Sequence, residues 1–278
     1  MHASMKPTEC GRGASDFDPE PAAALLLSHP GHELRVHGFV ERARPLVWVV
    51  TDGSGRAGTA RTLASAAVIA SVGARVGSLF GRMSDRELYA AVRSGELSPF
   101  IELAQEIADA LVSEAIVRLV SDAAEHQVLA HDLIAAVADA AVALAERRGR
   151  AIAHYDFALY AAPEACPPGA RARALRIELD GEALARKRCA AERYPEIATE
   201  IAHDRVQHGD DAFRVELLRP VDRPFDRIRP CGSPAWQLHG EDLVHAGVYP
   251  EAIRYDRHVA PIVDGLRRLA DGRSQCAF

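Results

Sequence analysis

Two histidines three positions apart, His29 and His32, carry the clearest chemical signal in this sequence, in a Ser-His-Pro-Gly-His-Glu segment at 28–33. Neutral imidazole is the commonest protein ligand for metals. Residues three apart at a helix start can face the same point. One more histidine would complete a three-ligand catalytic zinc site. Two surface histidines at a helix N-terminus are the alternative interpretation of the pair.

A third histidine, His131, opens a long alanine-rich segment that follows another apolar segment and a loop. His126, in the same loop, is a spare candidate. We place His131 first because it begins the predicted helix, as His32 does. The sequence therefore predicts one divalent metal, zinc before others, held by His29, His32 and His131.

The elements around these histidines alternate between strand and helix through the first 160 residues. Apolar runs predict strands, and segments with helical spacing or caps predict helices. This alternation predicts an α/β fold: a Rossmann-like, open, mostly parallel sheet with helices on both faces. Ligands bind such sheets outside the carboxyl ends of the strands, where the histidines fall. The predicted strands are 23–28, 46–51, 76–80, 116–120 and 151–157, and the predicted helices are 34–43, 61–72, one capped by Ser84, 98–113 and 131–148.

The remaining segments predict one domain, residues 22–278, with a C-terminal elaboration from about residue 161. Residues 1–21 are expected to be a disordered lead-in. The elaboration is expected to hold an edge strand at 175–179, helices at 181–194, 197–207 and 249–270, a short strand at 213–218 and a loop at 222–240. Lys187 is expected on a solvated helix face.

Composition limits the classes of partner. The chain has 278 residues and a formal net charge of −6, which argues against a broad surface for nucleic acid or anionic membrane. It lacks an apolar run long enough to span a membrane, and its N-terminus does not resemble a signal peptide. Its five cysteines are scattered, as in a reducing compartment. We expect a cytoplasmic protein acting on a small-molecule substrate, with no nucleic-acid or membrane partner; a homo-oligomer is left open.

The order of motifs resembles the LmbE/PIG-L family of metal-dependent de-N-acetylases, over roughly residues 22–220. That order is a strand, His-Pro-x-x-Glu, a helix, a strand ending in Thr-Asp-Gly, an arginine at the next helix start, and later a histidine opening a long helix. The resemblance implies hydrolysis of an N-acyl amide by metal-activated water. It also implies that His29 is a metal ligand, and that Pro30 and Glu33 match the family motif.

The sequence departs from the family motifs at chemically important positions. The family has Asp-Asp after His-Pro, the first as general base and the second as ligand. Gly31 and His32 stand in those places. Of the family's second motif, His-Pro-Asp-His, only the final ligand His131 is present. Three neutral imidazoles leave the full double charge on a metal, which should acidify its water more strongly.

Other residues at the same edge are candidates for the missing base or for substrate contacts. Glu125 and Asp52 are the catalytic candidates, although each could instead cap a helix or orient a histidine. Asp122 is expected mainly to orient a histidine. Arg61 is a candidate for binding an anionic substrate group, and Glu216 is a candidate for lining the substrate pocket.

Three functional hypotheses follow. The first is a zinc-dependent amidohydrolase, with a natural-product tailoring enzyme of different chemistry as a variant. The second is a non-catalytic metal-binding or ligand-binding relative. The third, a nucleotide-binding protein, is disfavoured because the turn after the first strand is not the glycine-rich turn that such proteins need.

Overall fold

The computed structural model describes residues 22–55 and 58–273, and the predicted lead-in at 1–21 lies outside them. These residues form a seven-stranded sheet in the order β3-β2-β1-β4-β5-β7-β6. The first five strands are parallel, and β7 runs antiparallel to both β5 and β6. The strands are β1 (Ala23–Leu27), β2 (Leu46–Thr51), β3 (Arg75–Met83), β4 (Arg118–Asp122), β5 (Ala153–Phe157), β6 (Leu175–Glu178) and β7 (Val215–Pro220). The predicted mostly parallel α/β sheet is confirmed.

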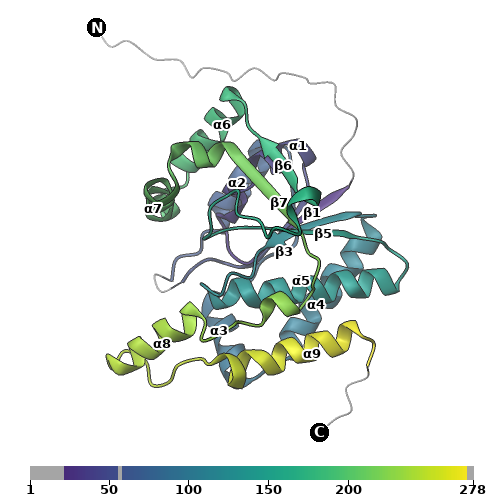
Figure 1. Ribbon diagram of the computed structural model, residues 1–278, viewed down its shortest axis with the longest axis vertical. Coiled ribbons are helices and arrows are strands. Elements are labelled where there is room, and N and C mark those ends of the chain that lie inside the picture. The colour runs from purple at the N-terminus through teal and green to yellow at the C-terminus, as the bar shows by residue number, and fades with distance from the viewer. Residues whose placement is uncertain (1–21, 56–57, 274–278) are drawn as a thin grey trace.

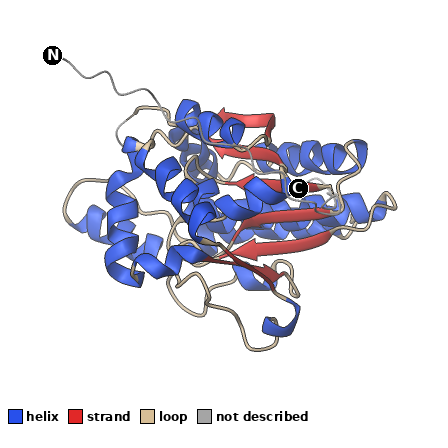
Figure 2. Cartoon of the chain, turned by 90° about the horizontal axis from the view of Figure 1, so that it is seen from above, coloured by secondary structure: helices blue, strands red, loops and turns tan. Residues whose placement is uncertain are grey.

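Helices cover both faces of the sheet (Figures 1 and 2). Side chains alternate along β1, so that Leu26 packs into one core and Leu25 and Leu27 pack into the other. Both cores are apolar because a central parallel strand has no solvent face. The helices are α1 (His37–Ala43), α2 (Thr62–Ser71), α3 (Asp85–Ser94), α4 (Ser98–Ser113), α5 (Leu129–Arg147), α6 (Gly181–Glu192), α7 (Ala198–His208), α8 (Ala235–His245) and α9 (Ala260–Ala270).

The order of strands reverses between β1 and β4. The chain runs outward from β1 through β2 to β3 and then returns to place β4 on the other side of β1. In open α/β sheets this reversal opens a crevice at the carboxyl edge, where ligands bind. His29 follows β1 directly, and His131 lies in the helix that follows β4. The topology therefore brings the two histidine segments to one crevice.

Three local predictions are wrong. The expected helix at 34–43 is a 3₁₀ turn, His32–Leu34, followed by the shorter α1. Helix α8 begins inside the segment expected to be loop, and none of its residues is fully buried, so it lacks the buried apolar face by which a helix is usually recognised. Lys187 does not lie on a solvated face: its ammonium is buried and lies 2.7 Å from Oε1 of Glu216.

No helix within the described ranges is long and apolar enough to cross a membrane. Among the same residues, Cys166, Cys189 and Cys231 are free thiols. The expected edge strand is confirmed as β6, which ends the sheet.

Candidate active site

The turn after β1 places His29 and His32 on one side of the crevice. Gly31 has a φ of 105°, a conformation that glycine adopts without steric cost. The carboxylate of Glu33 closes the turn by accepting the N–H of Gly31 at 2.8 Å. A Cβ atom at position 31 would lie 3.0 Å from Cδ1 of Ile197. Position 31, where the family that the sequence resembles has its base, is therefore restricted in its backbone and covered by an apolar side chain.

The three predicted histidines come together. Their ring centroids lie 5.4 Å apart for His29 and His32, 5.2 Å for His29 and His131, and 4.8 Å for His32 and His131. Tetrahedral zinc with Zn–N bonds of about 2 Å would space imidazole centroids by about 5 Å. However, in the residues that the structure describes no group of three or more His, Cys, Asp or Glu side chains is already arranged to hold a metal. The spacing fits zinc, while final ligation would need the rings to turn.

His32 is oriented by Asp122, at the end of β4. Nδ1 of His32 lies 2.9 Å from Oδ2 of Asp122, which also accepts the N–H and the hydroxyl of Ser28 at 2.7 and 2.5 Å. Burial opposes ionisation of Asp122, but the adjacent histidines and these hydrogen bonds outweigh it and lower the pKa of the carboxyl to about 2. An ionised Asp122 fixes the ring so that Nε2 is the nitrogen left for a ligand.

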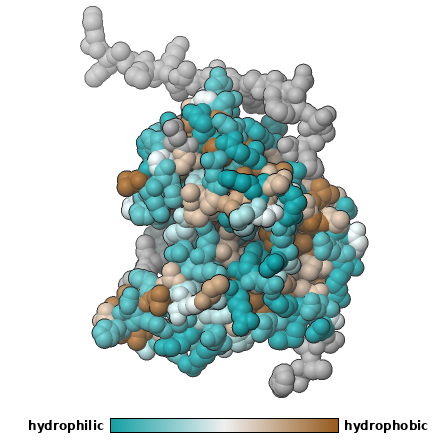
Figure 3. All heavy atoms as spheres, in the orientation of Figure 1, coloured by the Kyte–Doolittle hydropathy of each residue, from teal (hydrophilic) through white to brown (hydrophobic). Residues whose placement is uncertain are grey.

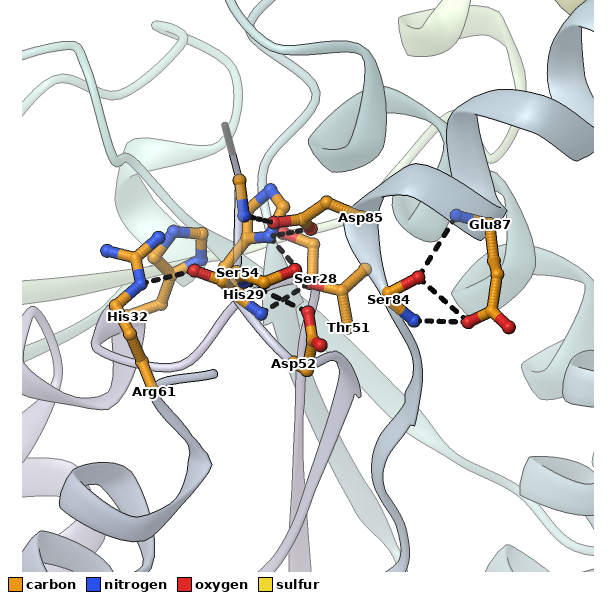
Figure 4. Close-up of polar contacts among 12 residues, drawn as sticks. Ser28, His29, His32, Thr51, Asp52, Ser54, Arg61, Ser84, Asp85 and Glu87 are labelled. Atoms are coloured by element: carbon orange, nitrogen blue, oxygen red, sulfur yellow. Dashed lines mark hydrogen bonds and ion pairs between the residues drawn. The ribbon is translucent and has the colours of Figure 1, made fainter. Parts of the chain in front are cut away.

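His29 is oriented by different side chains, Thr51 and Asp85, which were not predicted from the sequence. Its Nδ1 lies 2.7 Å from Oγ1 of Thr51 and 3.1 Å from Oδ1 of Asp85, as Figure 4 shows. The other oxygen of Asp85 accepts the N–H of Gly55 at 2.6 Å. Although burial opposes its ionisation, the contact with His29 lowers the pKa of Asp85 well below its usual range. Asp85 follows Ser84, the correctly predicted helix cap after β3, and therefore lies at the same carboxyl edge of the sheet as His29. This position is the feature of the sequence that could have identified Asp85 as a partner of His29.

Burial favours the neutral form of His29 and of His131. It lowers the pKa of His29, and it lowers the pKa of His131 well below the usual value, where the nearby His32 and His29 reinforce the effect. Nδ1 of His131 is buried and has no hydrogen-bond partner among the residues that the structure describes. Neutral imidazoles and an unsatisfied buried nitrogen are what a metal site requires of its ligands.

The two acids predicted as catalytic candidates are not brought to the histidines. The carboxylate of Glu125 accepts three backbone N–H groups, from Leu159, Tyr160 and Ala161, at 2.7 to 2.9 Å. Oδ1 of Asp52 accepts the N–H of Ser54 at 2.9 Å. Neither acid lines the cavity at the site. These contacts give both residues a role in holding loops.

Of the two predicted substrate-binding residues, only Arg61 lines the cavity. Its Nε donates to the carbonyl of Gly53 at 2.6 Å, and Nη1 lies 3.6 Å from Oε1 of Glu200. The placement of Glu216 in the pocket wall is wrong. Its carboxylate accepts the N–H groups of Gly38 and Phe39, both at 2.8 Å, and pairs with Lys187, and Glu216 itself does not line the cavity.

A cavity of about 1990 Å³ opens over the three histidines. Helices α7 and α8 both contribute to its lining, and Figure 1 shows them on opposite sides of the sheet's layer. Figure 3 shows hydrophobic and hydrophilic residues side by side on the surface around α8. Tyr89, Tyr160, Trp236 and Tyr249 supply aromatic lining. Ligand cavities typically measure about 300–1,000 Å³, so this one has room for a bulky molecule.

Solved structures that are similar to this chain include deacetylases. A deacetylase triple mutant from the teicoplanin biosynthetic pathway matches with a TM-score of 0.52 and 14% identity, over 72% of this chain and 97% of that one. The zinc-inhibited form of teicoplanin deacetylase matches with a TM-score of 0.50 and 14% identity over the same shares. No family model and no curated sequence matches the chain.

The chain thus has the α/β fold of LmbE/PIG-L-type de-N-acetylases, which confirms the resemblance at the level of the fold. Its sequence departs from the motif of that family, since His32 and Gly31 stand in the places of the two aspartates of the motif.

Proposed function

We propose that this protein is a zinc-dependent hydrolase that cleaves an N-acyl amide bond of a small molecule, with His29, His32 and His131 as the ligands. The observation that carries the proposal is the spacing of the three imidazole rings, 4.8 to 5.4 Å between centroids, at the reversal point of the sheet. The deacetylase activity of the structural neighbours supports the reaction class.

The residues present fit a divalent metal. Nδ1 of His29 and of His32 each faces an oxygen acceptor, which leaves Nε2 as the free nitrogen of each ring. His131 supplies an imidazole whose Nδ1 has no hydrogen-bond partner within the described part of the chain. When bound, zinc would polarise the acyl carbonyl and lower the pKa of water.

In the overall reaction a water oxygen bonds to the acyl carbon and the C–N bond breaks. One proton of the water goes to the leaving nitrogen, and the other stays with the carboxylic acid, which ionises at neutral pH and passes it to the amine or to solvent. The chain's own part is to place the amide over the three histidines and to shield it within the cavity. With Gly31 in place of an acid and with Asp85 and Asp122 engaged by histidines, no carboxylate of the motif serves as a ready base. The charge left on the metal by three neutral ligands lessens that need.

The test is hydrolysis by the full chain. Protein freed of metal by a chelator is supplied with zinc and given a panel of N-acetylated sugars and N-acylated aromatic amines, and amine release is measured. Zinc-dependent release from any member supports the proposal. A protein that binds zinc but releases no amine supports the second candidate, a non-catalytic relative.

That second candidate is favoured by one observation, the loss of the family base at Gly31 together with the cover that Ile197 places over it. A tailoring enzyme that uses the same metal for other chemistry would share this feature. Product analysis by mass spectrometry separates the two, since a tailoring reaction changes the mass of the substrate without releasing an acid.

A further inference from the structure

Tyr160 lies beside the candidate metal site, on the loop that follows β5. Its ring centroid is 6.0 Å from that of His131, with the planes inclined by 41°, and its side chain lines the same cavity. It is 46% exposed, so its ring does not serve the core.

The backbone around Tyr160 is held from both sides although it belongs to no helix or strand. The carboxylate of Glu125 accepts the N–H groups of Leu159, Tyr160 and Ala161. On the carbonyl side, the guanidinium of Arg35 donates to Ala158, Leu159 and Ala161 at 3.0 to 3.1 Å. The segment 158–161 is therefore fixed by six hydrogen bonds from two charged side chains.

Burial of the charged Arg35 side chain is energetically unfavourable unless its guanidinium is hydrogen-bonded. Its side chain is 8% exposed, and one further bond reaches Oδ2 of Asp204 in α7 at 2.9 Å. Burying a charge demands compensating hydrogen bonds, which the loop carbonyls provide. Two charged groups that immobilise the backbone of one half-exposed tyrosine are typical of a preorganised functional group.

We propose that Tyr160 donates a hydrogen bond from its phenol to the acyl oxygen of the substrate, and that Glu125 and Arg35 position it. This inference rests on the proposed function. Adding water to an amide carbonyl places negative charge on the acyl oxygen, and a fixed neutral donor stabilises that charge. The phenol is protonated at neutral pH and keeps its proton throughout.

Several polar groups near the histidines are already engaged or carry the wrong charge for this role. The Nε of Arg61 donates to Gly53, while Asp85 carries a negative charge that would repel the developing oxyanion. Nδ1 of His29 and of His32 is directed to Thr51 and Asp122. The phenol of Tyr160 is a neutral donor on a rigid loop next to His131.

The test is Tyr160→Phe in the zinc-loaded full chain, with Tyr155→Phe as the matched control, because Tyr155 lies in the preceding strand outside the cavity. Tyr160→Phe is expected to lower kcat about 10²-fold with KM nearly unchanged, since loss of one oxyanion donor costs roughly 10²–10³ in kcat. It should also weaken binding of methylphosphonate, a tetrahedral anion, at least tenfold by calorimetry, with zinc content unchanged. The control should match the wild type in each measurement.

A double variant tests the positioning role. If Glu125 acts through Tyr160, Glu125→Gln combined with Tyr160→Phe should cost little more than Tyr160→Phe alone, because coupled residues are not additive. Additive losses would refute the role of Glu125. Wild-type kcat and methylphosphonate affinity in zinc-loaded Tyr160→Phe would overturn the inference while leaving the proposed function intact. Failure of the wild type to bind zinc would overturn both.

Discussion

Nδ1 of His32 lies 2.9 Å from Oδ2 of Asp122, and the same oxygen accepts the main-chain N–H of Ser28 at 2.7 Å. One buried carboxylate therefore links the turn after β1 to the end of β4, across the point where the strand order reverses. The contact orients a candidate ligand and joins the two central strands at once.

Asp122 should contribute to stability in a pH-dependent way in the metal-free protein. Its pKa is lowered from 3.8 to about 2, so the stabilisation is fully present above about pH 4 and is lost as the pH falls through 2. A shift of this size corresponds to about 2 kcal/mol. The difference in unfolding free energy between wild type and Asp122→Asn, measured with urea, should narrow by that amount between pH 4 and pH 2. A difference that stays constant with pH would contradict the assignment.

Asp85 should support zinc binding while Asp52 should not. Asp85→Asn weakens the contact with Nδ1 of His29, and loss of such an outer partner typically lowers metal affinity about 10–100-fold. Asp52→Asn is the matched control, because its side chain bonds only the N–H of Ser54 among the contacts shown. Competition with a chromogenic chelator measures both affinities. Equal zinc affinities of the two variants would contradict the role of Asp85 in supporting zinc binding.

Restoring the family's acid at Gly31 should not by itself restore family chemistry. Asp in this left-handed conformation costs roughly 1–3 kcal/mol, and its Cβ would press on Ile197. We expect Gly31→Asp to lose stability without gaining deacetylase activity, and Ile197→Ala to relieve the contact but not the backbone strain. Gly169→Asp is the control, since a Cβ there meets open space. An active and fully stable Gly31→Asp would show that the turn adapts freely.

The buried pair of Lys187 and Glu216 should be a large contributor to stability. Removing one partner of a buried ion pair costs about 3–5 kcal/mol, because the other charge stays buried. Lys187→Met should lose that amount in urea unfolding, and Glu216→Gln in the same chain should recover part of it. Arg188→Met, at the next and exposed position of α6, should change stability by less than about 0.5 kcal/mol. Similar losses for Lys187→Met and Arg188→Met would contradict the buried pair.

The sheet and the meeting of the histidines could be predicted because both follow from general rules. Unbroken apolar runs such as Leu46–Thr51 mark covered parallel strands, and carboxyl ends of such strands share an edge. Side chains directly after β1 and in the helix after β4 then have to approach one another. The approach of His29, His32 and His131 could therefore be predicted from these rules alone.

The roles of the acids could not be predicted, since their partners are backbone groups distant in the sequence. Glu125 binds amides more than thirty residues away, and Glu216 binds the first turn of α1. No side-chain pattern marks an amide acceptor of this kind. Helix α8 was missed for a different reason: none of its residues is fully buried, although Trp236 packs partly against the core, so the apolar stripe that marks a helix is weak in its sequence.

The zinc content of histidine variants tests the central claim most directly. Wild type and the variants His29→Ala, His32→Ala, His131→Ala and His126→Ala are purified without added metal, dialysed against equal low zinc, and measured by elemental analysis. His126 is the control, because it lies in the loop before α5 but does not line the cavity. The account predicts about one zinc ion per chain for wild type and His126→Ala, and a large loss in the other three. Full zinc content in any of those three would contradict the assignment of that histidine as a ligand.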